Sequence, residues 1–173
     1  MANLIVRVFH LKGLQHILYM YIINHWLVGT EHFELKRKML NSLGCNLGKG
    51  VKVVAPIHFT TCISVGEDTW IGGGFCVQGN GTVRIGKNCD FGPEVAITTG
   101  SHKLGTHERR AGEGVNHAIS IGDGCWIGNR VTVINNSTIG DGCVVAACSC
   151  VISDVEANTL VAGVPAKVKK RLE

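Results

Sequence analysis

The chain has 173 residues, of which 45% are hydrophobic and 17% charged, which suits one folded domain and excludes a disordered chain. The formal net charge of +4 is small, so we expect no nucleic-acid partner. The eight cysteines include no Cys-x-x-Cys pair, and we expect no secretory leader ahead of them. Small buried thiols in a reducing cytoplasm are therefore favoured over disulfides or zinc ligands.

Residues 1–46 predict a helical lead-in that caps the rest of the chain. Leu11, Leu14, Leu18 and Tyr21 recur at helical spacing, and the apolar stretch 13–28 is too short to span a bilayer. We expect this helix to pack against the body of the protein or a partner subunit rather than to contact a membrane. A helix that lies on a membrane surface stays open as the alternative.

Residues 47–162 repeat with a period of six. One phase of the repeat is held by Leu47, Val53, Phe59, Val65, Ile71 and Val77, then by Ile85, Phe91 and Ile97, and later by Ile121, Ile127, Val133, Ile139, Val145 and Val151. This period fits neither a helix nor an isolated strand, but it fits a chain that alternates short strands with corners, coil after coil. We expect the glycine that often follows the apolar residue to tolerate the backbone angles of the corner, and the stacked coils to bury an aliphatic column.

Residues 101–118 interrupt this rhythm with a polar, charged and glycine-containing segment. Because each hexad extends the stack, the inserted residues must leave it as an extruded loop, which is a common place for function. The loop holds His102, His107 and His117. His102 lies at its root, where the scaffold can fix the ring, and imidazole titrates near neutrality as a general base must. For His107 and His117, an exposed loop position and a place in the acceptor pocket both stay open.

The repeats, as in IGDGCWIGNRVTVINNSTIGDGCVVAACSCVI, together with FGPEVAITTGSH and LVAGVPAKVKKRL, resemble the hexapeptide-repeat acyltransferase family. The likeness is greatest to its maltose, galactoside, xenobiotic and capsular-sugar O-acetyltransferases. It implies a mainly β fold: a left-handed parallel β-helix with an N-terminal helical segment and one extruded loop. It also implies a cytoplasmic homotrimer that moves acetyl from acetyl-CoA to a hydroxyl of a sugar or saccharide precursor.

The resemblance also implies roles for individual residues. His102 matches the family's general base, and the basic tail 163–173 places Lys167 and Lys170 where relatives bind the phosphate end of CoA, a solvated terminus being the alternative. The pantetheine arm would run past Trp126, Gly128, Asn129, Ala147 and Ser149. Asn80, Glu108 and Arg109 would contact the acceptor, although Asn80 in a simple turn and a solvated charge run remain alternatives.

The sequence departs from the family at several of these places. Gly72 to Gly74 replace an asparagine near the acceptor of galactoside- and maltose-type members, and Ile152 replaces a threonine that bonds CoA in some relatives. Glu94 stands where relatives often have asparagine, and we assign it no role. The first departure puts the disaccharide substrates of those relatives in doubt.

Other functions compete with this interpretation. His102 and His107 have the spacing of two zinc ligands in hexapeptide proteins that resemble γ-carbonic anhydrases. However, His107 falls in the loop and no histidine lies near position 66, so we expect no metal. An acetyltransferase that acts on an antibiotic or an amino sugar stays open, as does a scaffold without catalysis.

Overall fold

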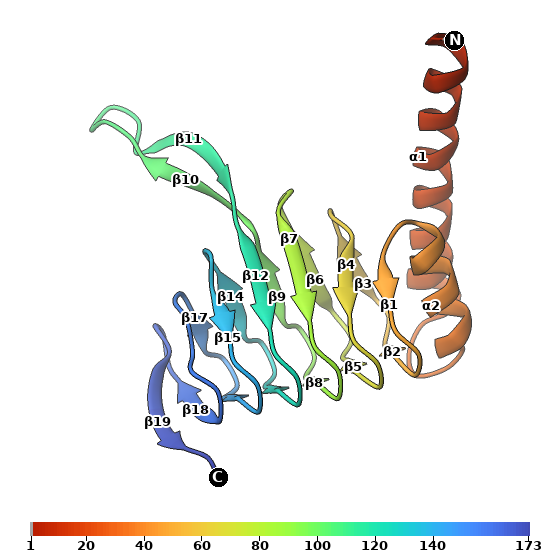
Figure 1. Ribbon diagram of the computed structural model, residues 1–173. Helices are drawn as coiled ribbons and strands as arrows, with labels where there is room; N and C mark the ends of the chain where they lie inside the picture. The colour runs from red at the N-terminus through yellow and green to blue at the C-terminus, as the bar shows by residue number, and fades with distance from the viewer. Residues whose placement is uncertain (1) are drawn as a thin grey trace.

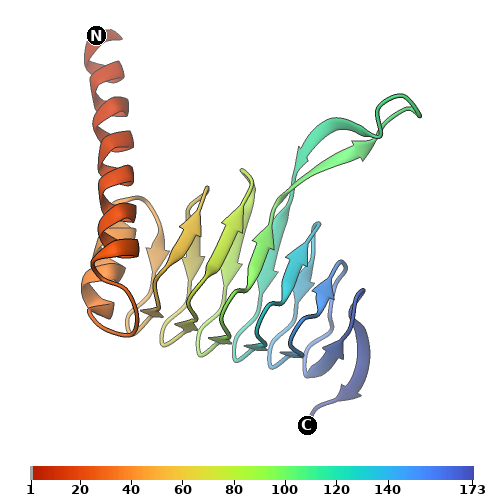
Figure 2. The same cartoon turned by 180° about the vertical axis from the view of Figure 1, so that it is seen from behind.

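The computed structural model describes the backbone of residues 2–173 and the side chains of residues 13–173. Helices α1 (Ala2–His25) and α2 (Phe33–Ser42) lie at one end of a solenoid of short strands, and one hairpin stands out from its middle (Figures 1 and 2). The chain enters at the helical end, winds along the solenoid and ends at the opposite end. The predicted fold class, a left-handed parallel β-helix with a helical lead-in and one extruded segment, is confirmed.

Three sheets form the faces of the solenoid, and each complete coil adds a strand to each of them. The first sheet holds β1 (Asn46–Leu47), β4 (Ile63–Val65), β7 (Thr82–Ile85), β12 (Ala118–Ile121) and β15 (Thr138–Ile139). The second sheet holds β2 (Lys52–Val53), β5 (Trp70–Ile71), β8 (Asp90–Phe91), β13 (Trp126–Ile127), β16 (Val144–Val145), β18 (Thr159–Ala162) and β19 (Lys167–Arg171). The third sheet holds β3 (Ile57–Phe59), β6 (Phe75–Gln78), β9 (Ala96–Thr98), β14 (Thr132–Ile134) and β17 (Cys150–Val151).

The apolar residues of the six-residue phase point inward and form a continuous core. Ile71, Ile97 and Ile127 are completely buried, because each coil covers the apolar side chain of the next. Phe75 stacks edge-on between Phe59 and Phe91, with ring centroids 5.9 and 5.5 Å apart. Burial of this column stabilises the solenoid, since no single coil can bury its own face.

All eight cysteines are free, and half of them are buried. The buried thiols of Cys89, Cys125 and Cys143 donate, each at 3.1 Å, to carbonyl oxygens of the following coil. They therefore act as small core residues whose weak donors are satisfied. Cys62 and Cys148 are exposed.

The glycines after the apolar residues serve a different purpose from the one expected. They are Gly48, Gly66, Gly72, Gly86, Gly92, Gly122, Gly128 and Gly140. Their φ angles lie outside the left-handed region, but a Cβ on Gly66 would lie 2.5 Å from the Lys87 backbone nitrogen. The left-handed residue comes two positions later, as at Asp68 and Asn88. Glycine is needed because adjacent coils approach closely, and the corner angle is left to the later residue.

The helix α1 packs on the body of this chain through only part of its surface. Ile23 is buried against the solenoid, and the Asn24 side chain exchanges two hydrogen bonds with the backbone of Ile57, at 2.8 and 2.9 Å. By contrast, Leu14, Leu18 and Tyr21 are 64%, 52% and 51% exposed, so the expected apolar stripe does not pack on the body of this chain. The side chain of Leu11 lies outside the described residues. Among the helices that the structure describes, none is both long and apolar enough to cross a membrane.

Candidate functional site

The segment that interrupts the repeats forms a two-stranded ribbon. Strands β10 (Gly100–Leu104) and β11 (Ala111–Asn116) pair antiparallel, with Gly100 opposite Asn116 and His102 opposite Gly114. An ion pair between Lys103 and Glu113, 2.7 Å apart, crosses the ribbon. The ribbon projects away from the coils (Figure 1), and its side chains are mostly exposed. The segment expected as a loop is thus a hairpin with a defined register.

His102 is fixed by a hydrogen bond within this hairpin. Its Nδ1 lies 2.9 Å from the carbonyl oxygen of Gly112. A carbonyl can only accept, so Nδ1 must carry the proton and donate it. The neutral ring then has its lone pair on Nε2, and the side chain is exposed. This is the tautomer and the accessibility that a general base requires.

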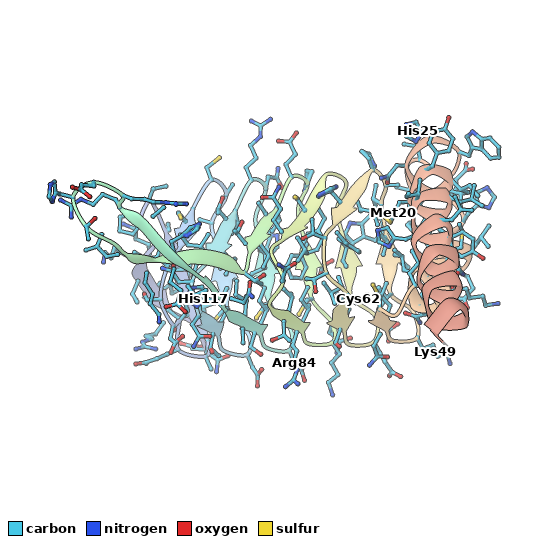
Figure 3. All side chains as sticks on the ribbon, turned by 90° about the horizontal axis from the view of Figure 1, so that it is seen from above. Met20, His25, Lys49, Cys62, Arg84 and His117 are labelled. Carbon is cyan, nitrogen blue, oxygen red and sulfur yellow. The ribbon has the colours of Figure 1, made fainter. Side chains whose placement is uncertain are left out.

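The other histidines of the hairpin lie elsewhere. His107 lies close to the free end, within the turn between the two strands. His117 lies at the root, where its amide donates to Thr99 at 2.7 Å and its carbonyl accepts from Thr82 at 3.3 Å. Its backbone therefore joins the hairpin to the neighbouring coil (Figure 3).

Of the residues predicted to meet an acceptor, Asn80 lies nearest the root of the hairpin. It sits in the turn Gly79–Gly81 between β6 and β7, and Gly81 packs directly on the backbone of His117. Glu108 and Arg109 lie in the turn at the free end of the hairpin. Within one chain the structure does not bring them to the turn that holds Asn80.

Four of the residues predicted to bind a cofactor follow one corner of the solenoid, between the second and third sheets. Trp126 is 61% exposed on the outer face of β13, and Gly128 and Asn129 follow it at the corner. Ala147 occupies the same corner one coil later, where its backbone nitrogen would lie 2.6 Å from a Cβ on Gly128. This part of the corner therefore carries small residues beside one exposed indole.

Ser149 differs from this group. It is 1% exposed, and its hydroxyl accepts the Gly163 amide hydrogen at 3.0 Å. The serine side chain thus faces the core and cannot reach a bound molecule at the surface. The sequence contained a signal for this, because Ser149 lies two residues before the inward-facing Val151, and alternate residues of an extended chain share a face.

The basic tail is an ordered strand whose side chains are exposed, rather than a frayed terminus. Strand β19 pairs antiparallel with β18, and a register shift places Lys167 opposite Ala162 and Lys170 opposite Leu160. Cross-strand partners share a face of a sheet, and Leu160 lies opposite Val144, which lies opposite Trp126. Both lysines therefore lie on the outer face that carries Trp126.

An ion pair that sequence reasoning missed lies at the same corner. Glu94 and Arg130 are paired across adjacent coils, and both residues have positive φ. The hydrogen bond from Arg130 lowers the pKa of the Glu94 carboxyl, and that bond raises the pKa of Arg130 in turn. The available signal was their common place in the repeat, two residues after Gly92 and Gly128.

No metal site is apparent in the part of the chain that the structure describes. Within it, no three side chains of His, Cys, Asp or Glu are arranged to hold an ion.

Three comparisons bear on this geometry. The family of bacterial transferase hexapeptides (six repeats) matches residues 118–153. A putative colanic acid biosynthesis acetyltransferase of Escherichia coli is 31% identical over 139 residues, 78% of this chain and 74% of the relative. Galactoside O-acetyltransferase of Escherichia coli is 28% identical over 155 residues, 88% of this chain and 75% of the relative.

A solved structure agrees with these relatives. A hexapeptide-repeat acetyltransferase of Vibrio cholerae, complexed with acetyl coenzyme A, superimposes with a TM-score of 0.81 and 29% identity, over 95% of this chain and 88% of that chain. The resemblance read from the repeats is therefore confirmed. The chain belongs to the hexapeptide-repeat acetyltransferases.

Proposed function

We propose that the protein transfers an acetyl group from acetyl-CoA to a hydroxyl of a sugar or saccharide precursor, with His102 as general base. The observation that carries the proposal is the 2.9 Å contact between His102 Nδ1 and the Gly112 carbonyl oxygen. The Vibrio relative with bound acetyl coenzyme A supports the co-substrate. The Escherichia relatives, named for galactosides and for colanic acid, support a saccharide acceptor.

The role of His102 follows from its tautomer. Nε2 accepts the proton of the acceptor hydroxyl as that oxygen attacks the acetyl carbonyl. The imidazolium then returns the proton to the departing sulfur, so that the ring ends neutral. The Gly112 carbonyl orients the ring and stabilises the positive charge that develops on it. A positioned base of this kind contributes about 10²- to 10⁴-fold to the rate.

The co-substrate fits the corner between the second and third sheets. Acetyl-CoA supplies an acetyl group activated as a thioester. The exposed indole of Trp126 and the small residues Gly128 and Ala147 let a pantetheine arm lie close to the backbone, and Asn129 is exposed there to donate or accept hydrogen bonds. Lys167 and Lys170 supply positive charge on the same face for phosphate.

The acceptor site needs more than one chain. Asn80 lies at the root of the hairpin, whereas Glu108 and Arg109 lie at its free end. In a homotrimer of parallel solenoids, the free end of one hairpin would reach the cleft beside a neighbouring subunit and bring Glu108 and Arg109 to its acceptor. The 84% exposure of Leu104 on the hairpin supports such a contact, because an apolar side chain there is otherwise unpartnered within the described chain. A cytoplasmic location stays a prediction.

The test is release of CoA from acetyl-CoA in the presence of a panel of hydroxyl and amine acceptors. We expect a saccharide hydroxyl to be preferred, and His102→Ala to lower turnover by about 100-fold or more while the Kd for acetyl-CoA is unchanged. His58→Ala, at an exposed position on β3, is the matched control. Near-normal turnover in His102→Ala would show that His102 is not the general base. A preference for amine acceptors would favour the amino-sugar or antibiotic alternative. Stoichiometric zinc in the purified protein would favour the carbonic-anhydrase-like alternative.

A further inference from the structure

Exposed apolar side chains gather at the helical end of the molecule. The structure describes twelve large hydrophobic side chains that are exposed, and seven of them lie between residues 14 and 35. The most exposed on α1 and just after it are Ile17 (68%), Leu14 (64%) and Trp26 (72%). We call the exposed side of α1, made by Leu14, Ile17, Leu18 and Tyr21, together with Trp26, the end face. Apolar patches of this kind on a folded protein mark interaction surfaces.

The end face points away from the solenoid. The opposite side of α1 packs on the coils through Ile23, which is buried, and through Met20, which adjoins the core. Figure 1 shows α1 crossing the end of the stack, and Figure 3 shows Met20 on the side of the helix toward the coils. A partner that covers this face can therefore approach from the end of the stack.

The charge of this segment indicates which partner fits. Residues 1–30 contain Arg7, Lys12 and three histidines but neither aspartate nor glutamate. Two copies stacked end to end would bring together two α1 helices that hold no acidic residue to balance their basic ones. A negatively charged surface that also accepts apolar side chains is complementary to it. Anionic lipid headgroups above acyl chains have this chemistry.

The aromatic residues fit the same partner. Tyr21 stacks on His25 with ring centroids 4.2 Å apart, and Trp26 meets Tyr21 edge-on at 6.4 Å. Tyrosine and tryptophan prefer the headgroup level of a bilayer, where the ring is apolar and its polar group stays hydrated. They lie at the end of α1 that joins the body, next to the apolar side chains of the end face.

We propose that the end face docks the protein on an anionic lipid surface, with α1 lying in the plane of the interface. This differs from the expectation drawn from the sequence, and it is independent of the transferase proposal. Docking by this face leaves the solenoid standing on the membrane, with its coils and the hairpin that projects from its middle in water (Figure 1).

The test is flotation of the full chain with vesicles. We expect co-flotation with phosphatidylcholine vesicles that contain phosphatidylglycerol, and much weaker binding to phosphatidylcholine alone. The triple variant Leu14→Ser, Ile17→Ser, Leu18→Ser should lower partitioning by about tenfold or more, because three apolar contacts are lost. Val164→Ser removes an equally exposed apolar residue at the other end of the chain and should bind as the wild type does. Thermal unfolding monitors whether each variant is folded.

Several results would overturn the proposal. The proposal fails if the wild type does not float with the vesicles, if the triple variant floats equally well, or if the protein binds neutral and anionic vesicles equally. A doubled mass in light scattering that the triple variant abolishes, without flotation, would show that a second copy covers the face. The CoA-release assay with a soluble acceptor contains no lipid, so these outcomes leave the transferase proposal untouched.

Discussion

His102 Nδ1 lies 2.9 Å from the carbonyl oxygen of Gly112, a residue ten positions away on the opposite strand of the hairpin. Antiparallel pairing of β10 with β11 creates this relationship, since neither strand alone can place a carbonyl beside the ring. The contact fixes both the orientation of the imidazole and the nitrogen that carries its proton. The proposed role of His102 as general base thus depends on the folded hairpin as well as on the residue.

We therefore expect neutral His102 to be the Nδ1–H tautomer. Long-range ¹H–¹⁵N correlation spectra of the labelled protein distinguish protonated from unprotonated ring nitrogens. The His102 signals, assigned by their absence in His102→Ala, should show Nδ1 as protonated and Nε2 as bare. Nε2–H as the main neutral form would contradict the proposed proton transfer, because no lone pair would then face the acceptor.

The two lysines of the outer face should act on the affinity for CoA rather than on chemistry. Lys167→Ala and Lys170→Ala should each raise the KM for acetyl-CoA by about tenfold, corresponding to one lost charge-assisted contact with phosphate, with kcat nearly unchanged. Lys169→Ala is the matched control, because Lys169 is the residue that the register shift leaves unpaired.

Titration with CoA and with dephospho-CoA sharpens this test. If the lysines bind the 3′-phosphate, the variants should lose affinity for CoA but little for dephospho-CoA. If Lys169→Ala raises the KM for acetyl-CoA equally, Lys167 and Lys170 supply only general positive charge and make no specific contact with phosphate.

The fold could be predicted from sequence because its period is local. Each hexad repeats the same inward apolar residue, as Ile121 and Ile127 do, so stacking follows without knowledge of distant contacts. The environment of α1 could not be predicted in this way. Helical spacing shows that Leu14 and Leu18 share a side of the helix, but it does not say whether that side faces the coils. The structure shows that it faces outward.

Residues of the candidate site could be predicted where they belong to a sequence motif. Contacts between segments that are distant in the sequence could not. His102 followed from TTGSH at the root of the insertion, whereas its partner Gly112 depends on the register of the hairpin. The pair Glu94 and Arg130 joins residues 36 positions apart. For Ser149, the resemblance predicts a place beside the pantetheine arm, and the burial of its side chain leaves only its backbone for such a contact.

Glycines of two kinds should respond differently to alanine. A Cβ on Gly66 would lie 2.5 Å from the backbone of Lys87, whereas one on Gly124 meets nothing within 4 Å but sits at φ +65°. Gly66→Ala must push two coils apart and should cost about 2 kcal/mol or more of unfolding free energy. Gly124→Ala should cost only about 1 kcal/mol, the penalty of the left-handed region. Urea unfolding measures both, and equal losses would show that close approach does not explain Gly66.

Stability should also fall at alkaline pH through Cys45. Burial against the neighbouring Cys62 thiol raises the pKa of Cys45 from its ordinary 9.0 to about 12. Between these values the unfolded chain has lost the proton that the folded chain keeps, so the folded state binds more protons and its stability decreases as pH rises. The full slope for one group is about 1.4 kcal/mol per pH unit.

Cys45→Ala isolates this effect, because all other titrating groups remain in both proteins. The variant should be less stable than the wild type at pH 8, where a buried side chain has been truncated, and the difference should shrink steadily above pH 9. Cys148→Ala, which removes an exposed thiol instead of a buried one, is the matched control over the same range. If the stability gap of Cys45→Ala does not change with pH, the Cys45 thiol titrates alike in the folded and unfolded chains, and burial does not hold its proton.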